Sequence, residues 1–120
     1  MKIFNSLIAY LLYWVSPKTL VNRSFKGVLL QLGVRLPDQV TTEIATNIFE
    51  VYRKNALYLK LTKKKNSMAN NLQTMFDLIQ YEAFYIRDLL NPSFTHVIHD
   101  DHQKTIEIFK KHKIEMPNLR

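Results

Sequence analysis

Hydrophobic residues recur at helical spacing in two successive stretches, one on each side of a Leu36-Pro37-Asp38 turn. Residues three and four positions apart share one face of a helix, so each stretch predicts an amphipathic helix with one buried stripe. The first stripe contains Val21, Phe25, Val28, Leu29, Leu32 and Leu36. The second stripe contains Val40, Ile44, Ile48, Val51, Tyr52 and Leu59. The two helices are expected to pack their stripes against each other.

Capping residues predict where these two helices begin and end. Ser16 can accept hydrogen bonds from free backbone N–H groups, and Pro17 suits the first position of a helix. The first helix is therefore expected to begin near Pro17. It is expected to end near Leu36, because Pro37 disfavours the helical conformation in the residue before it. Asp38 is expected to cap the second helix, near the positive end of the helix dipole.

A third and more regular stripe follows in the second half of the chain. It contains Met68, Leu72, Met75, Phe76, Ile79, Ala83, Ile86 and Leu90. Ser67 is expected to cap this helix, and Asn91-Pro92 should end it. Three stripes are buried together most simply in an antiparallel three-helix bundle, predicted over residues 17–91. Residues 92–120 show a weaker pattern, which predicts a C-terminal extension with one short helix and a tail that is extended or disordered unless a partner holds it.

The N-terminal segment, residues 1–16, is the most apolar part of the chain and includes an uncharged run from Leu7 to Val15. At about 1.5 Å per residue, this run is too short to cross the roughly 30 Å of a bilayer core. Wound as a helix it leaves almost no face for water, so we expect it to dock on a partner subunit or to lie in a membrane interface. Leu7, Leu11 and Trp14 are its main docking candidates, and the alternative is a fourth helix of the chain's own bundle.

The amino-acid composition limits the possible fold class and the chemical type of a binding partner. Only 2 glycines and 4 prolines occur in 120 residues with helical periodicity throughout, which predicts an all-α domain. No cysteine is present, so disulfides, thiolate metal sites and cysteine catalysis are excluded. The net charge of +7 indicates an anionic partner: an acidic protein, RNA or a membrane surface. Residues 1–37 carry basic residues but no acidic ones, a composition typical of mitochondrial targeting.

Two polar clusters are candidates for chemistry. His96, His99 and His102, with the adjoining Asp100 and Asp101, form a set of possible zinc or iron ligands. One helix cannot present all three histidines on one face, so we favour a polar capping and hydrogen-bonding cluster that opens the last helix. The other cluster is the basic loop, which contains Lys63, Lys64 and Lys65. Charge repulsion predicts a solvated loop there, and an RNA or phospholipid contact is the alternative.

The hairpin of the first two helices resembles the LYR-motif family of small mitochondrial proteins over roughly residues 20–90. Ser24-Phe25-Lys26 stands where that family carries Leu-Tyr-Arg, and Arg35-Leu36-Pro37 matches its Leu-Pro turn. Tyr52-Arg53 stands where the family carries Phe-Arg on the second helix. The resemblance implies binding of mitochondrial acyl carrier protein, whose acyl-phosphopantetheine chain would enter the bundle. Lys26 and Arg53 would then pair with acidic residues of the carrier, and Phe25 and Tyr52 would border the chain.

These observations together lead to an expected function. The chain is expected to be a non-catalytic accessory subunit or assembly factor of a mitochondrial respiratory-chain complex, with the NADH dehydrogenase complex as first candidate. It would lie on the matrix side of the inner membrane, among other subunits and with no cofactor of its own. No phosphate-binding loop or nucleophile motif argues for catalysis. The alternative is a basic helical protein that binds RNA, within a ribosome for example, through the basic loop and the C-terminal lysines.

Overall fold

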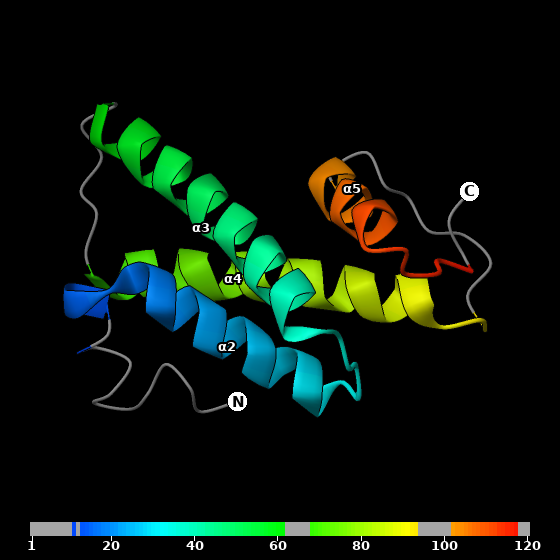
Figure 1. The fold of residues 1–120 in the computed structure, drawn as a ribbon. Helices are drawn as coiled ribbons and strands as arrows, with labels where there is room; N and C mark the ends of the chain where they lie inside the picture. Colours follow the sequence, from blue (N-terminus) through cyan, green and yellow to red (C-terminus); the bar gives the residue numbers. More distant parts are fainter. Residues whose placement is uncertain (1–10, 12, 62–67, 94–101, 118–120) are drawn as a thin grey trace.

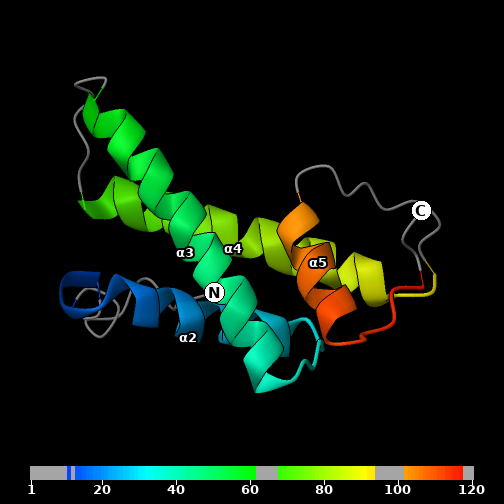
Figure 2. The ribbon, with the colours of Figure 1, turned by 45° about the horizontal axis from the view of Figure 1, so that its top comes forward.

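Every element in the described part of the chain is a helix, which confirms the all-α prediction. The computed structural model describes residues 11, 13–61, 68–93 and 102–117, with the backbone alone at 56–61 and 68–70. The helices are α2 (Pro17–Gln31), α3 (Asp38–Leu61), α4 (Met68–Leu90) and α5 (Gln103–Lys111). The first three run in alternating directions, and α5 lies beside the first half of α3 and the second half of α4 (Figure 1; Figure 2).

The turn between α2 and α3 begins earlier than predicted, because α2 ends at Gln31 instead of near Leu36. Gly33 has a φ of 76°, a left-handed conformation that glycine adopts without steric cost. The backbone N–H of Val34 then bonds back to the carbonyl of Leu29 at 2.9 Å. This is the Schellman arrangement, in which a glycine just beyond the last turn ends a helix. Gly33, not the later proline, therefore terminates α2.

The predicted cap is present at the start of α2 but not at the start of α3. The side-chain oxygen of Ser16 accepts a hydrogen bond from the backbone N–H of Thr19 at 3.4 Å, which confirms Ser16 as the cap of α2. Asp38 is the first residue of α3 instead of the residue before it. Its exposed carboxylate lies 3.4 Å from the Nζ of Lys26, so it connects the two helices across the turn. Ser67, the expected cap of α4, lies outside the described residues.

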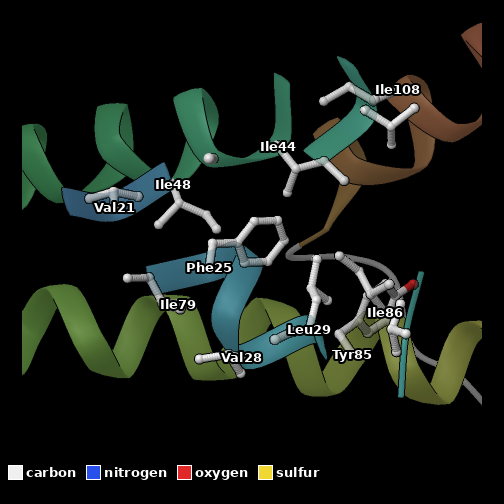
Figure 3. Close-up of a cluster of buried hydrophobic side chains, with 14 of the residues drawn as sticks. Val21, Phe25, Val28, Leu29, Ile44, Ile48, Ile79, Tyr85, Ile86 and Ile108 are labelled. Atoms are coloured by element: carbon white, nitrogen blue, oxygen red, sulfur yellow. The ribbon is translucent and has the colours of Figure 1, made fainter. Parts of the chain in front are cut away.

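The predicted stripes form one core between α2, α3 and α4. Figure 3 shows Phe25 of α2 among Ile44 and Ile48 of α3 and Ile79 of α4. Each such side chain contributes roughly 1.5 to 3 kcal/mol when it leaves water, so this cluster supplies the main stabilisation of the bundle. The prediction was wrong for Val51, which is 38% exposed. Val51 instead lines a hollow between α3 and α4, together with Leu78 and Tyr81 of α4.

The C-terminal helix is more than an extension of the bundle. A short helix was predicted after Ser93, and α5 confirms it. Thr105, Ile106, Ile108 and Phe109 are buried, and the last three belong to the same core cluster as Phe25. The helix ends with Lys113 in the left-handed region at a φ of 58°. We conclude that α5 is a fourth helix of the folded domain and contributes to its core.

Candidate functional site

An exposed apolar patch directly precedes α2. Leu11 and residues 13–15 are helical, and the side chains of Leu11, Trp14 and Val15 are 55%, 73% and 81% exposed. We call these three residues the docking patch. Leu7, the other residue expected there, lies outside the described residues. Trp14 and Val15 are the most exposed large hydrophobic side chains in the described part of the chain. This agrees with an apolar segment that the bundle itself does not cover.

Tyr13 fixes the docking patch to the bundle. Its hydroxyl accepts a hydrogen bond from the Asn71 Nδ2 of α4 at 2.7 Å and lies 3.4 Å from the Tyr52 hydroxyl of α3. Burial raises the pKa of Tyr52, and its hydrogen bond with Tyr13 raises that pKa further. The Trp14 ring meets the Tyr13 ring edge-on, with ring centres 6.0 Å apart. The patch is therefore presented in a defined orientation. Sequence reasoning missed this role, although a tyrosine in an apolar segment signals a hydroxyl that needs a partner.

The two aromatic residues assigned by resemblance to the acyl chain belong to one core cluster but come from different helices, Phe25 from α2 and Tyr52 from α3. Phe25 is fully buried in the centre of the core (Figure 3). Tyr52 is also buried, but its hydroxyl is directed to Tyr13 near the beginning of α2. Each can border an apolar ligand only where the helices leave room beside it.

The two cations assigned to the carrier, Lys26 and Arg53, are both exposed. Lys26 pairs with Asp38, and the guanidinium of Arg53 lies 3.9 Å from the Glu50 carboxylate. Asp38 and Glu50 are twelve residues apart on α3, which places the two cations roughly 18 Å apart along that helix. Exposed ion pairs of this kind contribute about 0 to 1 kcal/mol, so both cations can exchange these partners for others.

A hollow lies between the middle of α3 and the middle of α4. It has a volume of about 340 Å³. Its lining residues are Asn47, Ile48, Val51, Leu78, Tyr81 and Glu82. The apolar side chains among them come from both helices, and Ile48 also belongs to the core cluster around Phe25. The hollow is large enough for part of an alkyl chain, which needs an apolar wall and few polar partners.

A buried polar cluster joins α4 to α5. The Glu82 Oε2 accepts a hydrogen bond from the Thr105 hydroxyl at 2.8 Å and lies 2.8 Å from the His102 Nδ1. The imidazole of His102 stacks on the ring of Tyr85, with centres 3.6 Å apart and planes 6° from parallel. Burial and the nearby charge of Glu82 raise the pKa of Tyr85 to about 12. The hydrogen bonds of Glu82 and the stacking of His102 on Tyr85 thus hold the start of α5 against α4.

Of the three histidines, only His102 is described, and for it the expected hydrogen bonding is confirmed while the expected capping is wrong. It takes part in hydrogen bonding at the start of α5, but its side chain does not cap that helix and turns to Glu82 instead. His96 and His99 lie outside the described residues, as do Lys63, Lys64 and Lys65 of the basic loop. Within the described ranges, no group of three or more histidine, cysteine or acidic side chains is arranged to hold a metal ion.

A second ionic cluster joins the other end of α5 to α3. Lys111 donates to one oxygen of the Glu43 carboxylate at 2.6 Å, and the His112 Nε2 lies 2.5 Å from the other oxygen. The hydrogen bond from Lys111, followed by that from His112, holds the pKa of Glu43 below its ordinary value. A groove of about 380 Å³ runs beside this pair, between α3 and α5, and carries charges of both signs. Both ends of α5 are therefore attached to the bundle.

Comparison with protein-family models, with curated proteins and with solved structures finds no match for this chain. Among the described helices, none combines the length and the apolar character that crossing a membrane requires. Among the described residues, surfaces open to a partner include the docking patch, the hollow between α3 and α4, the groove between α3 and α5, and the outer side of α2.

Proposed function

We propose that this chain is a non-catalytic accessory subunit or assembly factor of a mitochondrial respiratory-chain complex on the matrix side of the inner membrane. The NADH dehydrogenase complex is the first candidate. The observation that carries the proposal is the docking patch, since Leu11, Trp14 and Val15 stay exposed beside a well-filled core. Adjacent exposed apolar residues mark interaction surfaces, and tryptophan is enriched where such interfaces are buried. A neighbouring subunit is the proposed cover of this patch.

The polar clusters support a non-catalytic role. Glu82 and Glu43 each accept hydrogen bonds from two side chains at an end of α5. Carboxylates used in this way hold helices together and give the domain one defined shape. A subunit that fixes the geometry of an assembly needs this rigidity.

Sequence features support the mitochondrial assignment and the acyl carrier protein as a further partner. Residues 1–37 contain no acidic residue, and the resemblance to the LYR-motif family covers the α2–α3 hairpin. An acidic helix of the carrier lying along α3 would meet Lys26 at one end and Arg53 at the other. The hollow lined by Val51 and Leu78 is the proposed place for the acyl chain.

The proposal is tested by co-purification of tagged chain from mitochondria of the source cells. Trp14→Glu is expected to abolish recovery of the complex, because a buried interface tryptophan commonly contributes at least about 2 kcal/mol, equivalent to roughly thirty-fold in affinity. Phe84→Glu is the matched control, since Phe84 is an exposed aromatic residue on α4 and should tolerate a charge. Both variants should keep the helical circular dichroism of the wild type.

Two results would contradict the proposal. One is a wild-type chain that is recovered from the cytosol without any inner-membrane complex. The other is equal recovery of the complex by both variants, which would remove the docking patch from the interface. Native mass spectrometry of the purified complex then tests the carrier directly, because a bound acyl carrier protein adds its own mass and that of its acyl chain.

A further inference from the structure

The outer side of α2 carries a line of exposed cationic and apolar residues. Arg23, Lys26 and Leu30 are spaced by three and four positions, so they share the face of α2 opposite its buried stripe. All three are exposed, and the Leu30 side chain is 58% exposed. The sequence of α2 contains no acidic residue. This face thus combines positive charge with an uncovered leucine.

The same surface continues beyond the end of α2. Arg35 joins Lys26 and Leu30 in lining a hollow of about 210 Å³ at the turn into α3. We call Arg23, Lys26, Leu30 and Arg35 the cationic face. Asp38 also lines this hollow, and its carboxylate pairs with Lys26. One exposed carboxylate leaves an excess of positive charge along the face.

Two of the three lysines of α5 lie beside carboxylates, so α5 carries less unpaired positive charge than the outer side of α2. Lys104 lies 3.9 Å from Glu107 in the same helix, and Lys111 donates to Glu43 of α3. Positive charge there alternates with carboxylates and largely cancels at the distance of a large partner. The cationic face of α2 is therefore a specific feature of the fold and not a uniform result of the net charge.

We infer that the cationic face lies on a membrane surface that contains anionic phospholipids. Headgroup phosphates attract clustered Lys and Arg residues, and each such cation adds about fivefold to the affinity. An exposed leucine among the cations suits the boundary between headgroups and acyl chains. RNA fits this face less well, because single-stranded RNA is held by aromatic stacking and none of the four residues of the face is aromatic. The inference goes beyond the proposed function, since it concerns a lipid surface and a face separate from the docking patch; only Lys26 belongs both to this face and to the proposed carrier contact.

Co-sedimentation of the isolated full-length chain with lipid vesicles tests this inference. Vesicles of phosphatidylcholine containing phosphatidylglycerol are compared with vesicles of phosphatidylcholine alone. The wild type is expected to bind the anionic vesicles and to release them as salt is raised, because salt screens the exposed charges. Arg23→Gln/Lys26→Gln is expected to weaken binding about thirty-fold, a factor of about five for each cation. Lys104→Gln/Lys110→Gln on α5 is the control, which removes the same charge and should change binding less than about threefold.

Three outcomes would overturn the inference. Equal binding to phosphatidylcholine alone would attribute the affinity to the docking patch. Equal weakening of vesicle binding by the two double variants would show that the affinity depends on the net charge of the protein and not on the cationic face. Binding to polyuridylic acid without binding to anionic vesicles would assign the cationic face to RNA. The assay uses no respiratory complex, so its failure leaves the co-purification test of the proposed function unaffected.

Discussion

Truncation of Phe109 to alanine tests whether α5 is an integral part of the domain. The Phe109 side chain is fully buried and belongs to the core cluster that α2, α3 and α4 also form. Replacing a buried phenylalanine by alanine costs about 3 to 5 kcal/mol, because apolar contact is lost and a cavity remains. Domains of this size have a total stability of only about 5 to 15 kcal/mol. We therefore expect Phe109→Ala to remove a large share of the free energy of unfolding.

The matched control is Phe84→Ala on α4. The Phe84 ring is 38% exposed and stacks under the guanidinium of Arg87, whose carbon lies 5.1 Å from the ring centre. Losing this contact is expected to cost about 1 kcal/mol. Urea titration followed by far-ultraviolet circular dichroism measures both variants. The two midpoints should differ clearly, since the expected costs differ by about 2 to 4 kcal/mol.

The result also distinguishes one cooperative domain from a bundle with a loosely attached helix. If α5 belongs to the core, Phe109→Ala lowers the midpoint of the single transition. If α5 unfolds by itself, the variant loses a small part of its helical signal early and keeps the wild-type midpoint for the rest. That second pattern, or a cost below about 1 kcal/mol, would refute the assignment of α5 to the core.

Two further predictions concern the ends of α5. Lys113→Gly should raise the free energy of unfolding by about 0.5 to 1 kcal/mol, because glycine adopts the left-handed conformation without strain. Lys110→Gly, inside the helix, should lower the free energy of unfolding by a similar amount. Urea titration of both variants checks that the two changes have opposite signs. The lowered pKa of Glu43 stabilises the fold above the ordinary value of 4.5, and this contribution is lost as the pH falls through the lowered value. Glu43→Gln should therefore flatten the acid limb of a plot of thermal midpoint against pH, and an unchanged acid limb would count against the ion pair.

Regular stripes made the bundle predictable, and local backbone chemistry decided where the prediction failed. The third stripe gives α4 with the predicted bounds, since most of its apolar residues meet a partner helix. The end of α2 was assigned to Pro37, whereas Gly33 four residues earlier ends it. Gly33 and Pro37 both disfavour a helix, and the sequence alone does not show at which of the two the helix ends. The exposure of Val51 depends on how α3 and α4 pack against each other and leave a hollow beside it, a tertiary property that periodicity alone does not contain.

The role of α5 could not be predicted for a different reason. Its contacts join residues far apart in the sequence, as in the hydrogen bonds of His102 with Glu82 and of Lys111 with Glu43. Each of these residues taken alone is typical of a solvated surface. The apolar residues Ile106 and Phe109 do share one helical face, but a helix of nine residues gives too short a pattern to indicate burial.

The surfaces proposed for binding lie on different helices, and this separation has a functional consequence. The docking patch and the cationic face belong to one continuous stretch, which runs from Leu11 to Arg35. The hollow between α3 and α4 includes no residue of that stretch, and it shares Glu82 with the cluster that holds α5. A chain attached to its complex through the docking patch and to the membrane through the cationic face would therefore leave the lining of the hollow uncovered. Occupancy of the hollow and attachment to the complex through the docking patch therefore need not exclude each other, whereas the membrane and the carrier would compete for Lys26.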